Sequence, residues 1–258
     1  MSESLIDRLR AMRKRRPLIV GHRGSAWSYP ENTIPAFGGG IRACAQMIEL
    51  DYRSTSDHVL VCAHDDDLNR CVTDDQPEAI GLCVSGMSYK RTQEFDVGKY
   101  KDESFTDCRM PTLREALSVI HPEAVPVLER KSGTPEQTVS LLREMGLVKD
   151  VIVASFDWHF LDLIHRIEPR ITIGAVAVGP LDDRKLNKMK SIGASVVHWG
   201  HQDITQATID RLHDADLFTV VWTLNFEMQF AGACAMNVDA ITTDRPRLLN
   251  EWFDARDK

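Results

Sequence analysis

Short apolar runs rich in valine and isoleucine alternate along this chain with stretches where apolar residues recur at helical spacing. The predicted strands are Leu18–Gly21, Met47–Asp51, Val59–Ala63, Val125–Leu128, Val151–Ala154, Ile171–Ala175, Ser195–His198, Phe218–Thr223 and Asp239–Thr242. The predicted helices are Thr33–Ala45, Thr112–Ile120, Pro135–Met145, Trp158–Ile167, Asp182–Ile192, Thr205–Asp214, Phe226–Ala235 and Pro246–Trp252. This alternation predicts an α/β fold.

Strands separated by single helices imply right-handed crossovers between parallel strands. About eight such units within 258 residues favour a closed TIM (β/α)8 barrel, and a doubly wound open sheet is the alternative. The regular pattern breaks at about 66–110, where the sequence is polar and has no clean period. We therefore expect a single barrel domain over residues 1–258, with an irregular insertion at about 66–110.

The N-terminal residues 1–16 have the pattern of a short amphipathic helix that Pro17 ends. An apolar stripe that includes Leu5, Ile6 and Leu9 is surrounded by basic residues, among them Lys14, Arg15 and Arg16. A helix that closes the bottom of the barrel is the favoured interpretation. A weak contact with a membrane surface is the alternative.

Lysine and arginine total 31 and aspartate and glutamate total 38, so the formal net charge is −7. Proteins that coat nucleic acid usually carry the opposite balance, and no apolar run approaches the roughly 18 residues of a transmembrane segment. None of the six cysteines forms a C-x-x-C pair, and we expect Cys44 and Cys62 to be small buried residues. With no apolar signal-peptide core near the N-terminus, these features favour a reducing cytoplasm. The oligomeric state is left open.

Carboxylates stand at the ends of two predicted strands, where a parallel barrel places its active site. Glu49 and Asp51 are two residues apart on one strand, so both side chains point to the same face. With Glu129 they make a cluster of three acids, and like charges so close need a cation to coexist. Hard oxygen ligands predict one divalent cation, Mg²⁺ or Ca²⁺.

Histidines and basic residues follow other predicted strands. His22 and His64 can divide general-base and general-acid work near neutral pH. Arg23 and Lys131 supply fixed positive charge of the kind that stabilises a phosphoester in transfer. His198 also lies at a predicted strand end, where it could line the pocket.

An ordered set of motifs resembles the glycerophosphodiester phosphodiesterase family. The motifs are Gly21-His22-Arg23-Gly24, Pro30-Glu31-Asn32-Thr33, Glu49-x-Asp51, His64-Asp65 with Leu68-x-Arg70, Pro111-Thr112-Leu113, Glu129-x-Lys131, Ser155-Phe156, Trp222-Thr223-x-Asn225 and Thr243-Asp244-Arg245-Pro246. They span roughly residues 18–250.

The resemblance implies a barrel, with the insertion after its third strand. It implies a divalent metal on Glu49, Asp51 and Glu129, the acid–base pair His22 and His64, and phosphate contacts from Arg23 and Lys131. In enzymes it resembles, the glycerol hydroxyl beside the phosphate attacks phosphorus to give a cyclic phosphate, which water opens to glycerol 3-phosphate. Glu31 and Asn32 would support the metal ligands or contact the glycerol, and Trp222 would form a pocket wall.

Three departures from the family pattern concern local geometry. They are the run Gly38-Gly39-Gly40 inside a predicted helix, Cys44 at an expected glycine and Asp57-His58 in place of an Asp-Gly turn. The glycine run predicts either an irregular helix or very close packing, since each glycine costs about 0.8–1.0 kcal/mol relative to alanine within a helix.

Other functions have their own sequence requirements. Gly38-x-Gly40-x-x-Ala43 fits a loose dinucleotide-binding pattern, but about 16 residues separate it from the first strand, which excludes that interpretation. A barrel that only binds phosphodiesters would lack an acid or a histidine, and none is missing. A phospholipase D-like hydrolase of lysophospholipids or related lipid phosphodiesters is the alternative activity. It would need an apolar groove formed by the insertion with Trp27, Tyr29 and Met87.

Overall fold

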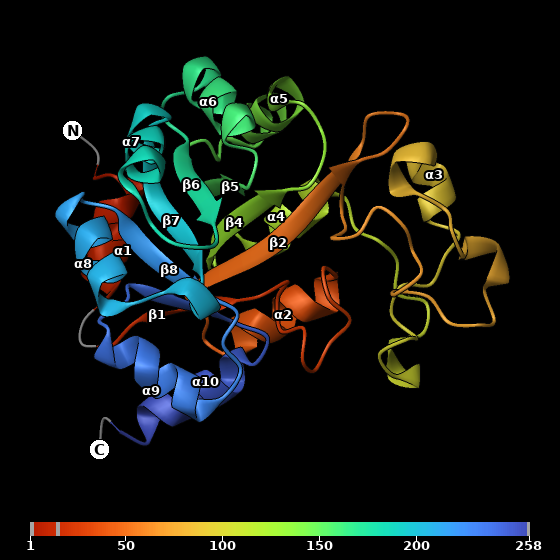
Figure 1. The fold of residues 1–258 in the computed structure, drawn as a ribbon. Coiled ribbons are helices and arrows are strands. Elements are labelled where there is room, and N and C mark those ends of the chain that lie inside the picture. Colours follow the sequence, from red (N-terminus) through yellow and green to blue (C-terminus); the bar gives the residue numbers. More distant parts are fainter. Residues whose placement is uncertain (1–2, 14–15, 257–258) are drawn as a thin grey trace.

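Eight parallel strands close into a barrel in the computed structural model, which describes residues 3–13 and 16–256 (Figure 1). The barrel strands are β1 (Leu18–Gly21), β2 (Met47–Ser54), β4 (Val125–Arg130), β5 (Ile152–Ser155), β6 (Thr172–Ala177), β7 (Ala194–Gly200), β8 (Phe218–Trp222) and β9 (Ala240–Thr243). The sheet order is β1-β9-β8-β7-β6-β5-β4-β2, and pairing of β1 with β2 closes the ring. The predicted TIM barrel is confirmed, and the open sheet is wrong.

Helices surround the barrel and cover its outer face. They are α2 (Ile34–Arg42), α4 (Leu113–Ile120), α5 (Pro135–Met145), α6 (Trp158–Ile167), α7 (Asp183–Ser191), α8 (Gln206–Asp214), α9 (Glu227–Ala235) and α10 (Pro246–Asp254). Two begin with capping boxes. The side chains of Thr112 and Thr134 accept hydrogen bonds from the backbone N–H of the third helical residue, and the side chain of that residue, Glu115 or Gln137, accepts one from the threonine backbone N–H. No helix in the described ranges is both long and apolar enough to cross a bilayer.

Helix α1 (Leu5–Met12) closes the N-terminal end of the barrel, as predicted. Leu5, Ile6 and Leu9 are buried and join the apolar cluster that fills the barrel interior. Arg8 and Arg13 anchor the helix through ion pairs of 2.7 Å to aspartates on the barrel. The helix is shorter than predicted, and positions 1, 2, 14 and 15 of the predicted segment lie outside the described residues.

The predicted third barrel strand is wrong. Strand β3 (Leu60–Cys62) pairs antiparallel with the end of β2, so that Ser54 lies opposite Leu60 and Tyr52 opposite Cys62. The link 55–59 is too short for a parallel crossover, which needs a dozen or more residues. Strand β2 therefore continues past its barrel neighbours, and β3 returns beside it (Figure 1).

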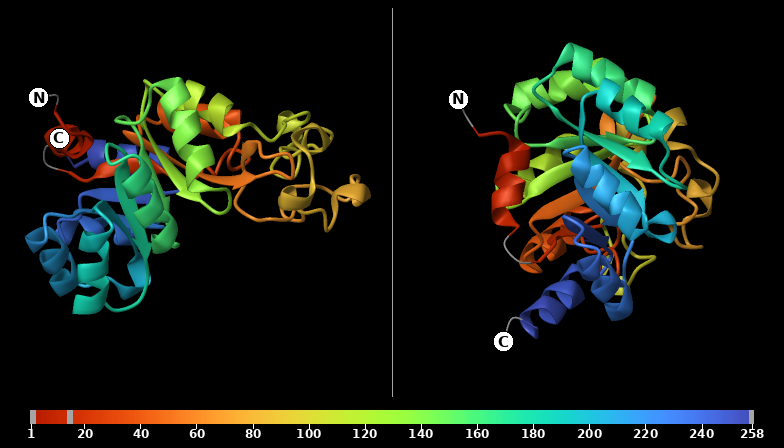
Figure 2. Two further views of the ribbon diagram at one scale, coloured as in Figure 1. Left: turned by 90° about the horizontal axis from the view of Figure 1, so that it is seen from above. Right: turned by 60° about the vertical axis from the view of Figure 1, so that its left-hand side comes forward.

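The segment from residue 66 to 110 forms a compact lobe beside the barrel. It contains α3 (Tyr89–Thr92) and the short 3-10 turns Pro77–Ala79, Val84–Gly86 and Glu103–Phe105. Leu68, Phe95 and Met110 belong to an apolar cluster that also includes Val61 on β3. Figure 2 shows the lobe at the opposite end of the molecule from α1.

The glycine run is resolved as close packing within a regular helix. A Cβ on Gly39 would lie 2.5 Å from the ring of Tyr29, and one on Gly40 would lie 2.5 Å from Ile48 Cδ1. Helix α2 can approach these neighbours only because both positions lack side chains.

The cysteines are free thiols, but one prediction about them is wrong. Cys62 is buried, whereas Cys44 is exposed. Cys44 has a φ of 59° in the turn after α2, and this left-handed position directs its side chain to the surface rather than into the apolar surroundings that the sequence indicated. His58 also has a positive φ, 66°, in the link between β2 and β3.

Candidate active site

Three carboxylates meet at the C-terminal mouth of the barrel. Asp51 on β2 lies opposite Glu129 on β4, and Glu49 lies two residues earlier on the same face of β2. One oxygen from each carboxylate lies within 4.8 Å of the other two. Glu49 and Asp51 are buried, with exposed fractions of 5% and 1%. The structure thus brings together all three acids that the sequence singled out.

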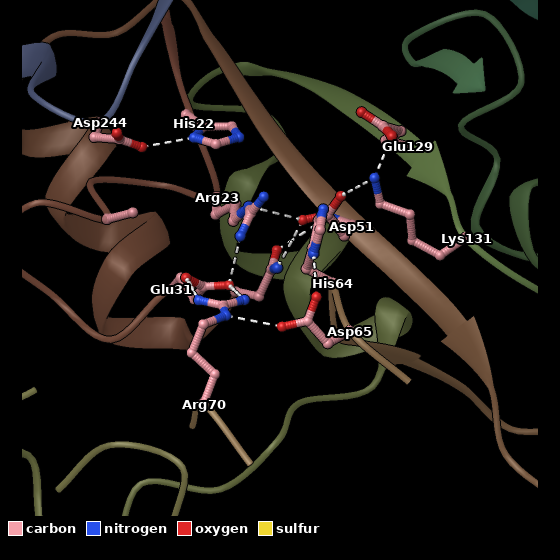
Figure 3. Close-up of polar contacts among 12 residues, drawn as sticks. His22, Arg23, Glu31, Asp51, His64, Asp65, Arg70, Glu129, Lys131 and Asp244 are labelled. Carbon is pink, nitrogen blue, oxygen red and sulfur yellow. Dashed lines mark hydrogen bonds and ion pairs between the residues drawn. The ribbon is translucent and has the colours of Figure 1, made fainter. Parts of the chain in front are cut away.

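Two basic side chains, Lys131 and Arg23, lie among these acids. Lys131 Nζ is 3.1 Å from Asp51 Oδ1 and also contacts Glu129, while Arg23 Nε is 3.1 Å from Asp51 Oδ2 (Figure 3). Burial opposes ionisation of Asp51, but Arg23 and Lys131 outweigh it and lower the pKa of this carboxyl to about 2. Asp51 is therefore a fixed negative charge.

For Glu49 the nearby His22 and Arg23 favour the ionised carboxylate but do not outweigh burial. Burial raises the pKa of its carboxyl well above the usual range, and the neighbouring Asp51 charge raises it further. One oxygen, Oε2, accepts the backbone N–H of Arg23, but the buried Oε1 has no hydrogen-bond partner. An orphaned carboxylate oxygen among hard oxygen donors fits a divalent cation.

His22 follows β1 and is held by an aspartate that follows β9. Its Nδ1 lies 2.6 Å from Asp244 Oδ1, and Asn225 donates to the other oxygen of Asp244 at 2.6 Å. Burial lowers the pKa of His22, but the hydrogen bond to Asp244 and the charge of Glu49 outweigh burial, so its pKa is raised overall. The bond also fixes the ring orientation and leaves Nε2 for other partners.

His64 reaches the mouth because β3 brings it back along β2. Its Nδ1 lies 2.7 Å from Asp65 Oδ1, and Arg70 from the lobe donates to Asp65 Oδ2 at 2.8 Å. Arg70 also makes two hydrogen bonds to Glu31, which pairs with Arg23 at 2.7 Å. Figure 3 shows this continuous network from the lobe to the barrel strands.

The remaining side of the mouth is apolar or uncharged. Phe156 after β5 packs edge-on against Trp222 at the end of β8, with ring centroids 6.0 Å apart. A cavity of about 210 Å³ lies between these rings and the charged groups. It is lined by His22, Arg23, Glu49, Asp51, His64, Glu129, Lys131, Phe156, His198, Trp222, Thr223 and Thr242. The predicted metal ligands, acid–base pair, phosphate contacts and pocket wall therefore line one cavity, whereas Glu31 and Asn32 lie outside it, paired with Arg23 and Asp51.

The sequence pattern of the glycerophosphoryl diester phosphodiesterase family matches residues 22–248. This chain belongs to that family. It is 29% identical to YhdW of Bacillus subtilis (strain 168) over 238 residues, which cover 90% of this chain and 96% of YhdW.

Solved structures of family members share the fold. The glycerophosphodiester phosphodiesterase of Agrobacterium tumefaciens strain C58 superposes with a TM-score of 0.77 at 27% identity, covering 91% of this chain and 99% of that one. A phosphodiesterase of Oleispira antarctica, solved with its product sn-glycerol-3-phosphate, has a TM-score of 0.84 at 21% identity, covering 95% and 99%. The chain is accordingly a phosphoric diester hydrolase, and its family uses a divalent metal.

Three further residues that line the cavity of this phosphodiesterase have no role assigned from the sequence. Thr242 was not predicted for the site, and neither His198 nor Phe156 was given a definite function there. The alternation of inward and outward residues along β7 and β9 carries the signal for the first two, because His198 and Thr242 follow the inward Val196 and Ala240 by two positions.

The prediction that the insertion forms an apolar groove with Trp27, Tyr29 and Met87 is wrong. Met87 is buried in the apolar cluster of the lobe, with an exposed fraction of 6%. Tyr29 packs against Phe105 and the Gly39 surface of α2. Only Trp27 is exposed, and the guanidinium of Arg245 lies 4.3 Å above its ring centroid. The lobe uses these apolar side chains for its own packing.

Proposed function

We propose that this chain hydrolyses glycerophosphodiesters to glycerol 3-phosphate and an alcohol, in a divalent-cation-dependent reaction with His22 and His64 as the acid–base pair. The observation that carries the proposal is the arrangement of one cavity. Three convergent carboxylates lie on one side, and two histidines, each held through Nδ1 by an aspartate, line the same space.

Glu49, Asp51 and Glu129 would hold the cation, as Mg²⁺ or Ca²⁺. When bound, it supplies positive charge that stabilises a phosphoryl oxygen as negative charge builds up there. The unpaired Oε1 of Glu49 supports this assignment, because a buried carboxylate oxygen without a partner is costly.

Arg23 and Lys131 would bind the non-bridging phosphate oxygens. Both have their pKa raised by nearby carboxylates, against the opposing effect of burial, so both stay positively charged at neutral pH. A bidentate guanidinium and a compact ammonium suit this role. In the structure each is paired with Asp51, so binding of the cation and the diester would redistribute these contacts.

The two histidines would move protons in the two halves of the reaction. One accepts the proton of the glycerol hydroxyl as its oxygen forms a bond to phosphorus, and the other protonates the departing alcohol oxygen. The product is a cyclic phosphate. In the second half the roles reverse, and water opens the ring to give glycerol 3-phosphate.

The first experiment is release of glycerol 3-phosphate from glycerophosphocholine or glycerophosphoethanolamine by purified protein with Mg²⁺ or Ca²⁺. No release with either ion would refute the substrate assignment.

The second experiment tests the cation ligands. Glu129→Gln should sharply weaken cation binding measured by calorimetry, whereas Glu136→Gln, on the exposed face of α5, should leave it unchanged. Equal cation affinity in both variants would refute the ligand assignment.

Lysophospholipids are the second candidate substrate. Exposed apolar side chains stand on loops that follow barrel strands and at the start of α9, with exposed fractions of 52% for Trp27, 51% for Phe156, 57% for Phe226 and 88% for Met228. Such residues could contact an acyl chain. Comparing turnover of lysophosphatidylcholine and glycerophosphocholine discriminates between the two substrates.

We propose the cytoplasm as the location of this protein, which the six free cysteines support.

A further inference from the structure

The uncharged side of the cavity contains polar groups that the proposed mechanism does not use. His198 on β7 and Thr242 on β9 both line the cavity and are buried, with exposed fractions of 5% and 3%. His198 Nε2 and Thr242 Oγ1 have no hydrogen-bond partner among the described residues. Trp222 Nε1, between them on β8, is also unpaired.

Three unpaired polar atoms on adjacent strands of one cavity are unusual, because buried donors and acceptors nearly always have partners. The chain also makes room for one of them. Residue 174 on β6 is glycine, and a Cβ there would lie 3.2 Å from His198 Nε2 and 3.0 Å from Ile152. Polar side chains kept at this depth indicate a ligand that supplies the missing hydrogen bonds.

The chemistry of these groups selects the kind of ligand. Burial lowers the pKa of His198 to about 4, so at neutral pH its ring is uncharged and has one donor and one acceptor nitrogen. A threonine hydroxyl likewise donates and accepts, and an indole N–H donates. Neutral groups of this type match alcohol hydroxyls, whereas phosphate oxygens are matched by the cations across the cavity.

We infer that His198 and Thr242 form a subsite for the terminal hydroxyl group of the substrate's glycerol, the one that does not attack phosphorus, opposite the groups that bind its phosphate. This inference rests on the proposed function and specifies which residues distinguish a polyol diester from an alkyl diester. Trp222 contributes its N–H at the edge of the same subsite.

The test measures binding rather than turnover. Glycerol 3-phosphate and propyl phosphate share the phosphate and the three-carbon chain, and only the first carries hydroxyls. Calorimetry on the cation-loaded protein should show tighter binding of glycerol 3-phosphate. Thr242→Val and His198→Leu should each weaken that binding about three- to tenfold, the equivalent of one net hydrogen bond, and leave propyl phosphate binding unchanged.

Two further variants separate recognition from folding. Thr219→Val changes a buried threonine on β8 whose hydroxyl bonds to a backbone carbonyl outside the cavity, so it should not alter the affinity ratio. His198→Gln, which keeps a donor and an acceptor, should restore part of the preference lost in His198→Leu.

The possible failures are distinguishable. If the wild-type protein binds the two phosphates equally, or if the Thr242 and His198 variants keep its preference, the subsite is refuted even when glycerophosphocholine is hydrolysed. If glycerophosphocholine is not hydrolysed but the preference is present and lost in the variants, the proposed function fails and the polyol subsite stands.

Discussion

The pair His22–Asp244 gives the sharpest functional prediction. Asp244→Asn preserves the volume of the side chain but removes its charge. Asn225 already donates to one oxygen of Asp244, so the new amide can offer its single oxygen either to Asn225 or to His22. The charge-assisted bond of 2.6 Å to His22 is then lost or replaced by a neutral one.

The size of the effect follows from that bond. Hydrogen bonds to charged groups contribute about 1.5–3 kcal/mol, and both side chains are mostly shielded, with 20% and 24% exposed. If His22 carries a proton in the transition state, kcat should fall about 10- to 150-fold. The hydrogen bond to Asp244 favours the protonated imidazole, so removal of the Asp244 charge lowers the pKa of His22. The part of the pH–rate profile that reports His22 should therefore move to lower pH.

The assay is glycerol 3-phosphate release from glycerophosphocholine between pH 5 and 9, at saturating cation. Asp65→Asn is the matched comparison, because it removes the equivalent charge beside His64. Asp65 is 35% exposed and more strongly solvated, so a smaller loss of kcat is expected there. An Asp244→Asn enzyme with wild-type kcat and a superimposable pH profile would refute the role assigned to this pair.

Other predictions concern packing, backbone and the lobe. In α2, Gly38→Ala should raise the free energy of unfolding by about 0.8–1.0 kcal/mol because its Cβ would meet only a flexible arginine end, whereas Gly39→Ala should lower it by about 1 kcal/mol because the ring of Tyr29 lies 2.5 Å away. Thermal unfolding resolves the two, at about 2–4 °C per kcal/mol, and shifts of the same sign would contradict the packing argument. His58→Gly should raise the melting temperature by a similar small amount because φ is 66°, and a lower value would refute strain there. Arg70→Met should lower kcat about three- to tenfold with an unchanged circular dichroism spectrum, and an unchanged kcat would show that the lobe does not position the site.

The strand-end argument placed His64 at the mouth of the barrel, where it lines the cavity, but for a wrong reason. The sequence placed it after a third barrel strand, whereas β3 is an antiparallel return along β2. The hydrogen bond from Ala63 N to Asp51 O brings the chain back to the level of the three clustered carboxylates. A short link between two apolar runs was the available signal, since it allows a hairpin and forbids a parallel crossover.

The supporting contacts were less accessible to prediction. Asp244 and Asp65 were visible beside strand ends, but nothing local shows that each bonds to a histidine Nδ1. Arg70 is 39 positions from Glu31 along the chain, and only the folded lobe brings them together. Cys44 illustrates the opposite error, because apolar neighbours in sequence did not bury a side chain held in a left-handed turn.

The sequence by itself determined the barrel and the main reactive groups. Alternating strands and helices have few ways to bury their apolar faces, and a parallel barrel gathers the ends of all its strands at one mouth. The spacing of Glu49 and Asp51 likewise follows from the two-residue period of a strand. Only the tertiary structure decided which groups hold the histidines, where His64 enters, and that His198 and Thr242 share a cavity with the three carboxylates. These relations depend on closure of the sheet and on packing between residues far apart in the chain, which no local pattern encodes.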